Sequence, residues 1–430
     1  MEEEPIIVAI DVGTTKVCTL VAREERPGEL RILGVGIEPS QGVRKGVVVD
    51  MLAASQAVVR SVEKAERSCG LEIDAALVGL AGSHVSSVNS RGVVGVSGRT
   101  IEPDDIERAV EAARAVAIPH NREIIHIIQR GFSIDGQEGI RKPLGMHGYR
   151  LEVETHIITA SAASVENLRQ CVGAANVDIL QFVLNPLAAG EAVLSETERD
   201  MGVVVCDIGG GTTNIAIYID GDVWHTNVLA VGGDHITSDI AHGLRLPVSQ
   251  AEEVKIQHGH ALKSEVRPEE YFTVRPFGEE QPAQFNRQEL CHIIEARVEE
   301  IFGLVLQEIK RSGYDGLLPA GMVLTGGTSA LPGIRGLASR TTGLPVRVAS
   351  PMQVEKTDDS PTLTGMVDKL DSPGFSTSVG LLRWAVLMSD LSALPYRPGG
   401  KAGPGRNPGG GLLANINWEA VKEFFKRLLP

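Results

Sequence analysis

The sequence is poor in the features that mark several other classes of protein. Its five cysteines lie far apart, with no Cys-x-x-Cys spacing, which in a chain of this length excludes a disulfide framework and predicts reduced thiols. No apolar run approaches the roughly 20 residues that a transmembrane helix needs. The acidic start, Met1–Pro5, lacks the basic region of a secretory signal. We therefore expect a soluble, cytoplasmic body.

Basic residues are also in the minority. The chain has 41 Lys and Arg against 55 Asp and Glu, and its formal net charge is −14. Such a field repels polyanions, so nucleic acid is not expected as a partner. With 430 residues, of which 43% are hydrophobic, the chain exceeds the size of one ordinary core, and two or more domains are predicted.

One local pattern occurs twice, far apart in the chain. β-branched and apolar residues flank the turn 11–16, and residues 203–218 repeat this arrangement, with Asp207 in the place of Asp11. Both turns run into strands rather than helices, which excludes a Rossmann fingerprint, and no P-loop run is present. The repeat predicts two related half-domains.

These turns have the chemistry of a phosphate site. A strand that ends in Asp-x-Gly and turns through Gly and Thr exposes backbone N–H groups that can wrap a phosphate, and its Asp can hold Mg²⁺ directly or through water. One such turn is usually a plain hairpin. Two matched copies, with a further Gly326-Gly327 turn after the predicted strand 321–324, favour phosphate binding.

The segments between these motifs predict two insertions. Residues 83–159 carry their own strands and helix and predict a small subdomain, and residues 234–312 are polar and helix-rich, with a proline-containing excursion at 268–282. In the first insertion, strands are predicted at 93–96, 124–128 and 151–158, and a helix at 103–117. Elsewhere, helices are predicted at 164–173, 334–341 and 376–388, and a strand-to-helix passage at 179–194.

The end of the chain predicts a tethered amphipathic helix. Residues 395–411 are dominated by Gly and Pro, a composition that cannot bury a core. Six apolar residues then recur at helical spacing opposite a charged face: Trp418, Val421, Phe424, Phe425, Leu428 and Leu429. Such a helix can pack on the body, enter a partner groove or lie in a bilayer interface. The long tether favours an external target, and the aromatic and basic residues favour an anionic membrane surface.

The order of these motifs resembles the actin, DnaK-chaperone and sugar-kinase superfamily. Within it, residues 134–152, 231–241 and 251–259 are similar to the FtsA family of cell-division proteins, and the resemblance covers nearly the whole chain. It implies an α/β, actin-like ATPase fold with two related half-domains around a nucleotide cleft, an inserted subdomain and a C-terminal amphipathic helix.

The resemblance also implies a division of the chain. The first half-domain takes residues 1–82 and 160–196, with the inserted subdomain at 83–159. The second takes residues 197–233 and 313–394, with an insertion at 234–312. A flexible linker, 395–417, and the membrane-targeting helix, 418–430, follow.

Site residues are carried over only onto matching positions. The β- and γ-phosphates of ATP would lie against Gly13, Thr14, Thr15 and Lys16 on one side and Gly210, Gly211, Thr212 and Thr213 on the other. The adenosine would lie against Gly233, Glu252, Lys255, Gly326 and Gly327, and Mg²⁺ against Asp11 and Asp207. Glu252 and Lys255, at i and i+3 of a predicted helix, could instead form a solvated ion pair.

One departure from the superfamily bears on hydrolysis. Asn185 stands where chaperones and MreB carry a Glu that positions the attacking water. An amide can orient a water but cannot accept its proton as a carboxylate does. We therefore expect at most a weak Mg-dependent ATPase.

The resemblance implies a protein that polymerises at the cytoplasmic face of the membrane, at the division site. It would bind the C-terminal tail of FtsZ through residues 234–312, anchor the FtsZ ring and recruit later division proteins. A pilus-assembly actin-like adaptor and, with less support, a sugar kinase of the same superfamily are the alternatives.

Overall fold

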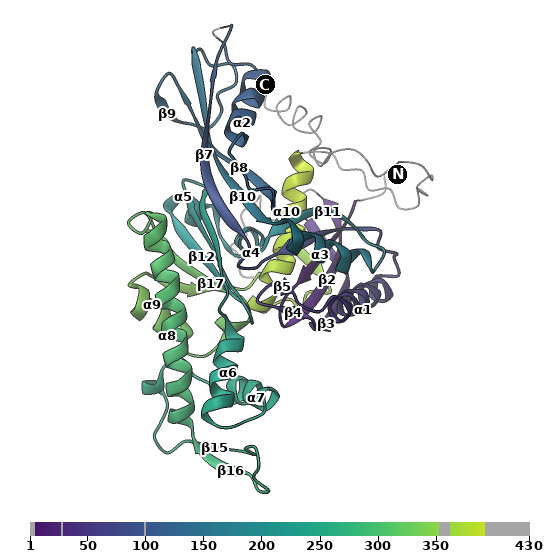
Figure 1. Ribbon diagram of the computed structural model, residues 1–430, viewed down its shortest axis with the longest axis vertical. Coiled ribbons are helices and arrows are strands. Elements are labelled where there is room, and N and C mark those ends of the chain that lie inside the picture. The colour runs from purple at the N-terminus through teal and green to yellow at the C-terminus, as the bar shows by residue number, and fades with distance from the viewer. Residues whose placement is uncertain (1–4, 27–28, 99, 352–361, 392–430) are drawn as a thin grey trace.

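The structure is a computed structural model that describes residues 5–26, 29–98, 100–351 and 362–391. Two sheets, each covered by helices, form two halves, and a third sheet lies above them in the view of Figure 1. The predicted linker 395–417 and the helix 418–430 lie outside the described residues. Within the described residues, no helix is both long and apolar enough to cross a bilayer.

A six-stranded sheet forms the first half, in the order β11-β6-β1-β2-β3-β19. Its strands are β1 (Ile6–Val12), β2 (Lys16–Arg26), β3 (Glu29–Pro39), β6 (Ala75–Leu80), β11 (Asp178–Leu184) and β19 (Thr362–Gly365). Its helices are α1 (Met51–Cys69) and α3 (Ala162–Gly173) on one face, and α4 (Asn185–Val193) and α10 (Ser376–Leu391) on the other. Because both faces are covered, β1 is apolar from Ile6 to Ile10 rather than alternating.

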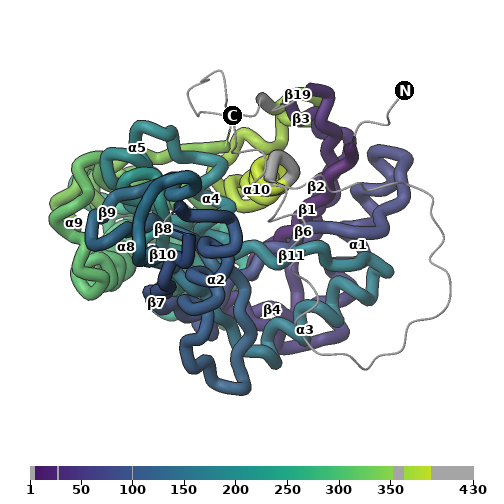
Figure 2. The backbone as a smooth tube through the Cα atoms, turned by 90° about the horizontal axis from the view of Figure 1, so that it is seen from above, coloured from purple at the N-terminus to yellow at the C-terminus, as the bar shows by residue number. Residues whose placement is uncertain are grey.

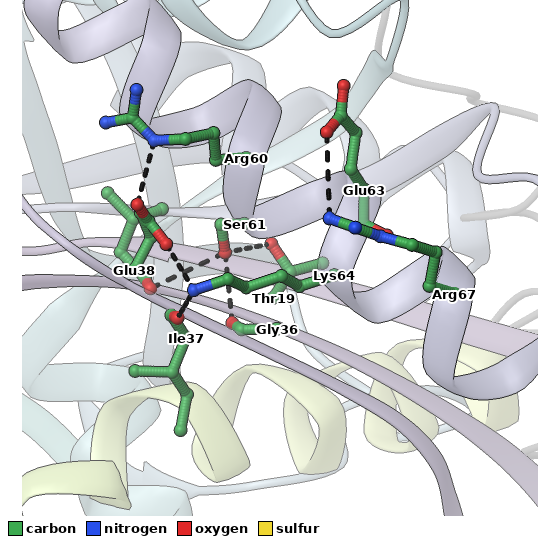
Figure 3. A network of polar contacts seen from close by, with 10 residues as sticks. Thr19, Gly36, Ile37, Glu38, Arg60, Ser61, Glu63, Lys64 and Arg67 are labelled. Carbon is green, nitrogen blue, oxygen red and sulfur yellow. Dashed lines mark hydrogen bonds and ion pairs between the residues drawn. The ribbon is translucent and has the colours of Figure 1, made fainter.

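Helix α1 rests directly on the backbone of β3. A Cβ at Gly36 would lie 1.9 Å from the carbonyl oxygen of Ser61, so only glycine permits this approach. The buried Ser61 hydroxyl donates to Gly36 O at 3.0 Å and lies 2.8 Å from the Thr19 hydroxyl (Figure 3). On the solvent side, Glu38 pairs with Arg60 at 2.8 Å. The contact fixes the strands that carry the first predicted turn.

A five-stranded sheet forms the second half, in the order β14-β13-β12-β17-β18. Its strands are β12 (Val203–Ile208), β13 (Thr213–Ile219), β14 (Asp222–Leu229), β17 (Gly321–Thr325) and β18 (Val346–Val348). Its helices are α6 (Gly233–Gly243), α7 (Val248–His258), α8 (Arg287–Ser312) and α9 (Ile334–Thr342). The short α5 (Glu196–Met201) follows α4 and leads into this half, and 3₁₀ turns occur at Lys263–Glu265, Gly327–Ala330 and Pro373–Phe375.

The proline-containing excursion predicted at 268–282 belongs to a projecting hairpin. Strands β15 (Tyr271–Val274) and β16 (Ala283–Asn286) pair antiparallel at the lower end of Figure 1. Asn286 then caps α8, because its side-chain oxygen accepts the backbone N–H of Gln288 at 2.7 Å. The hairpin therefore connects directly to the longest helix of the second half.

The third sheet has the order β7-β10-β8-β9. Its elements are β7 (Ser86–Gly95), β8 (Arg122–Ile134), β9 (Gln137–Ile140), β10 (Arg150–Ser161) and α2 (Pro103–Arg114). The strand predicted at 93–96 is only the last part of β7, which begins at Ser86 because β10 pairs along its whole length. The helix predicted to reach Ala117 ends at Arg114. The length of β7 is therefore set by its pairing with β10 and cannot be read from the residue pattern of β7 itself.

This third sheet touches both halves. Leu184, at the end of β11, donates its backbone N–H to Nε2 of the buried His126 at 3.1 Å. His156 lies with Nε2 2.9 Å from the hydroxyl of Thr226 on β14. Viewed from above in Figure 2, β1 to β3 lie to one side of the molecule and α8 and α9 to the other.

Candidate functional site

The two predicted turns are equivalent hairpins. Asp11 pairs with Cys18 across β1 and β2, and Asp207 pairs with Asn214 across β12 and β13. In each turn the glycine two residues after the Asp donates its N–H to a carbonyl three residues further on, at 3.0 Å and 2.9 Å. The two turns have the same length and register, so the repeat in the sequence is also a repeat in the structure.

These turns face each other from the two halves. A Cβ at Gly210 would lie 2.3 Å from Oγ1 of Thr15, and a Cβ at Gly211 would lie 2.7 Å from Oγ1 of Thr14. Side chains on the second turn would therefore push the halves apart. Glycine there keeps both backbones within reach of one ligand.

Two further elements of the second half complete the walls. Helix α6 begins beside the second turn, where Gly233 N donates to Gly209 O at 2.9 Å. After β17, Gly326 takes a positive φ of 86°, and a Cβ there would lie 2.3 Å from Oδ1 of Asp207. Thr328 then donates its hydroxyl to Gly209 O at 2.9 Å.

All these elements enclose one cavity of about 330 Å³. Most of the predicted ATP and Mg²⁺ residues line it: Asp11, Gly13, Thr14, Thr15, Lys16, Asp207, Gly210, Thr212, Gly233, Glu252, Lys255, Gly326 and Gly327. Two do not. Gly211 sits behind the wall against Thr14, and the buried hydroxyl of Thr213 donates to Val231 O at 2.8 Å. The structure therefore brings together predicted residues that lie as far apart in the sequence as Asp11 and Gly327.

The two aspartates lie at the base of the cavity and are almost fully buried. Ser378 donates to Asp11 at 2.9 Å, and Asn214 and Thr377 each donate to Asp207 at 3.1 Å. Burial raises the pKa of Asp11. Burial, with the nearby charge of Asp11, raises the pKa of Asp207 to about 6. The positive charge near these two carboxylates is therefore too small to offset the cost of burying them in their ionised form.

A divalent cation fits this base. The described residues contain no group of three His, Cys, Asp or Glu side chains at metal-binding distance. Mg²⁺ commonly takes only one or two carboxylates and completes its shell with water and phosphate oxygens. Two buried carboxylates beside a phosphate-sized turn match that donor set, and a cation there would offset the cost of their burial.

Lys16 lies at the part of the cavity wall that contains Gly374. Its ammonium donates to Gly374 O and sits 3.8 Å from the centre of the Phe375 ring. The residue lines the cavity as predicted. It is held, however, by the chain segment that precedes α10.

Glu252 and Lys255 are paired on one face of α7, at 2.6 Å. The pair is not simply solvated, because the Lys255 side chain is only 12% exposed. Its ammonium also donates to Gly233 O at 3.2 Å and to the hydroxyl of Thr237 at 2.9 Å. The apolar residues Ile236, Ile256, Leu331 and Pro332 line the same end of the cavity. This end can accept a flat ring with polar edges.

The sequence did not single out the residues that α10 adds. Thr377 lines the cavity and, with Ser378, holds the two aspartates, although nothing near it forms a phosphate motif. Its only signal is a Ser-Thr-Ser run at the start of a predicted helix. Asn185, at the start of α4, also lines the cavity, and its buried Oδ1 has no hydrogen-bond partner among the described residues.

Comparisons with known proteins agree with this geometry. The family model for cell division protein FtsA matches residues 204–380, and the model for the SHS2 domain inserted in FtsA matches residues 82–159. The cell division protein FtsA of Pseudomonas aeruginosa is 41% identical over 89% of this chain and 89% of its own. The chain belongs to the FtsA family. The predicted family is thereby confirmed, and with it a role in cell division.

Other FtsA relatives are similar over comparable lengths. The Bacillus subtilis protein is 39% identical over 90% of this chain and 84% of its own. The Escherichia coli K12 protein is 35% identical over 89% of this chain and 90% of its own. Membership of this family sets aside the pilus-assembly and sugar-kinase alternatives.

Solved structures confirm the predicted actin-like fold. The chain is similar to a PilM-PilN type IV pilus biogenesis complex, with a TM-score of 0.64 at 17% identity over 88% of this chain and 98% of that one. It is also similar to MreB5 of Spiroplasma citri bound to AMPPNP, with a TM-score of 0.55 at 16% identity over 91% and 98%. At such identities the likeness concerns the fold alone.

Proposed function

We propose that this FtsA family member binds ATP with Mg²⁺ in the cavity between its halves. The observation that carries the proposal is the pair of equivalent turns facing each other across that cavity, with a buried carboxylate at the base of each. Backbone N–H groups and Gly–Thr turns are suited to phosphate oxygens. The MreB5 structures, which contain ADP or AMPPNP, share the fold.

The roles of the residues follow from their positions. Gly13 to Lys16 of the first turn and Gly210 and Thr212 of the second would hold the β- and γ-phosphates, while Gly211 and Thr213, which do not line the cavity, would shape the second turn from behind. Asp11 and Asp207 would hold Mg²⁺, which supplies positive charge to the phosphate oxygens when it is bound. Glu252 and Lys255 would bind the ribose and the edge of the base, and Gly233, Gly326 and Gly327 would let the adenosine approach the backbone.

We propose that hydrolysis is slow. Asn185 lines the cavity with an uncharged side chain whose buried oxygen, like that of Asn214, has no hydrogen-bond partner among the described residues. Its amide can orient a water but cannot take up the proton. ATP then acts chiefly as a ligand that stabilises one arrangement of the halves and, through it, self-assembly.

The remaining proposals concern partners. The chain would assemble with copies of itself at the cytoplasmic face of the membrane, bind the C-terminal tail of FtsZ through residues 234–312 and recruit later division proteins. The tail helix, 418–430, would insert its apolar face into an anionic membrane surface. One such helix binds weakly, but a polymer that presents many of them gains avidity.

Co-sedimentation with anionic liposomes tests both parts. The full chain is compared with one that ends at Gly411 and with the full-length F425D variant, each with and without Mg-ATP. We expect the full chain to pellet, more strongly with Mg-ATP, and the other two to stay in the supernatant. Equal pelleting of all three would refute the membrane role of the helix.

Nucleotide binding is measured separately on the chain that ends at Gly411. Calorimetric titration with Mg-ATP then tests the cavity in the absence of a membrane and of the predicted membrane-binding helix. We expect saturable binding of Mg-ATP to the wild-type sequence. The K255A variant should bind Mg-ATP more weakly. No binding to the wild-type sequence would refute the nucleotide part of the proposal and leave the membrane part standing.

A further inference from the structure

The lysine of the first turn is held by a segment that lies 358 residues further along the chain. The Lys16 ammonium donates to Gly374 O and lies 3.8 Å from the centre of the Phe375 ring. A Cβ at Gly374 would lie 3.3 Å from Lys16 Nζ and 3.5 Å from Gly327 Cα. Because Lys16, Gly374 and Gly327 all line the cavity, the ammonium is held at the wall where the first turn approaches the glycine turn after β17.

The 3₁₀ turn that contains Phe375 is fixed to both halves. Toward the second half, Pro373 O accepts the backbone N–H of Gly326 at 3.1 Å, and the hydroxyl of Thr325 lies 3.3 Å from the same oxygen. Toward the first half, the half-buried Phe375 packs at the edge of the apolar core that contains Leu20 of β2. The Phe375 ring is therefore held in place independently of its contact with Lys16.

This arrangement leaves the Lys16 ammonium able to bind a ligand. A lysine ammonium has three hydrogen-bond donors. One is directed to Gly374 O, and the ammonium makes no other hydrogen bond with a described residue. The face of an aromatic ring attracts a cation electrostatically and takes up no donor. Holding a flexible lysine in one arrangement before a ligand binds also reduces the conformational entropy that binding would otherwise cost.

We propose that Phe375 is a positioning residue for nucleotide binding: together with Gly374 O, its ring holds the Lys16 ammonium where it meets the phosphates. This inference rests on the proposed function and deepens it, because it names what orients the phosphate-binding lysine. Through the hydrogen bond between Pro373 and Gly326, the same 3₁₀ turn connects Lys16 of the first half to the second half. The Phe375 ring therefore contributes to the affinity for phosphate and not to the affinity for adenosine.

The test compares ligands with and without phosphate, using the full chain. Affinities for Mg-ATP and Mg-ADP are measured by calorimetric titration, and the affinity for adenosine by its competition with Mg-ADP. We expect F375L to weaken the binding of Mg-ATP and Mg-ADP about three- to tenfold, as the loss of a cation–π contact predicts. The affinity for adenosine should stay within about twofold of the wild-type value, because adenosine offers Lys16 no phosphate.

Two further proteins distinguish the ring's electrostatic attraction from its packing. A pentafluorophenyl ring at position 375 keeps nearly the shape of phenylalanine but removes the negative potential from the ring face, so it should weaken both nucleotides as F375L does. The matched control is F182L, which changes a ring of β11 that also lies beside a cation, 5.1 Å from the guanidinium of Arg169, and does not line the cavity. It should leave all three affinities unchanged.

The double variant with K16M tests whether Phe375 acts through Lys16. If it does, K16M with F375L should bind Mg-ATP no more weakly than K16M alone. Additive losses in the double variant, or an equal loss of affinity for adenosine and for Mg-ATP in F375L, would overturn the inference. Unchanged or tighter binding of Mg-ATP by F375L and by the pentafluorophenyl protein would overturn it as well. Wild-type protein that binds neither nucleotide would instead refute the proposed function itself.

Discussion

The buried charge of Asp207 should destabilise the folded protein when no ligand occupies the cavity. The D207N variant tests this prediction. The carboxylate is buried, and neither of its hydrogen-bond donors, Asn214 and Thr377, carries a charge. Asparagine has nearly the same size and no charge. A residue retained at a cost to stability is expected where it serves a ligand.

The size of the expected change in the free energy of unfolding follows from the pKa of Asp207, which rises from 3.8 to about 6. Each tenfold change in proton affinity is worth about 1.4 kcal/mol, so keeping this group ionised costs about 3 kcal/mol above pH 6. An amide at this position has one acceptor oxygen for two donors, which forfeits about 1 kcal/mol. The variant should therefore be more stable than the wild type by about 2 kcal/mol at pH 7.5.

The direction of the pKa shift determines how the stability contribution of Asp207 changes with pH. Because the pKa is raised on folding, the folded chain binds more protons than the unfolded chain between about pH 4 and pH 6. The contribution of Asp207 to stability is therefore greatest below pH 4 and declines as the pH rises to 6. D207N lacks that decline, so its advantage should reach zero at about pH 4.5 and become a deficit of about 1 kcal/mol below about pH 4.

The assay is urea unfolding without nucleotide and with EDTA, followed by tryptophan fluorescence at pH 4.5, 5.5 and 7.5. D178N, which changes an exposed aspartate on β11, is the control and should show no such pH-dependent difference. The same D207N protein should lose Mg²⁺-dependent binding of ATP. A variant less stable than the wild type at pH 7.5, or equally offset at every pH, would refute the reasoning.

Three further predictions concern substitutions in α10, α8 and α4. G380A should destabilise the protein by about 1–3 kcal/mol, because its Cβ would lie 1.7 Å from Ala188 O where α10 crosses α4. G303A, in α8 with nothing near its Cβ, should instead stabilise it by about 0.5–1 kcal/mol, and thermal melts that rank the two the other way would contradict the packing. N185D should raise phosphate release from ATP about tenfold or more, since a carboxylate can take up the proton, and a rate equal to that of the wild type in a phosphate-release assay would show that position 185 does not limit hydrolysis.

Much of the fold follows from local pattern. The repeated turns, the strand before Gly326 and the helix predicted at 334–341 lie where apolar spacing and glycine predict them, because hydrogen bonds within a hairpin or a helix depend on nearby residues. The length of a strand depends less on neighbouring residues and more on the strand that pairs with it. The polar run from Ser86 joins β7 only because β10 pairs with it, a partner more than sixty residues further along the chain.

What the sequence by itself determined is the pair of phosphate-type turns, the family and the spacing that joins Glu252 to Lys255. Only the tertiary structure decided the rest of the site. Thr377 reaches Asp207 across 170 residues, and Ser378 reaches Asp11 across 367. The physical reason is that a turn is fixed by neighbouring residues, whereas burial, pKa and charge partners are fixed by whichever distant segments fold against it.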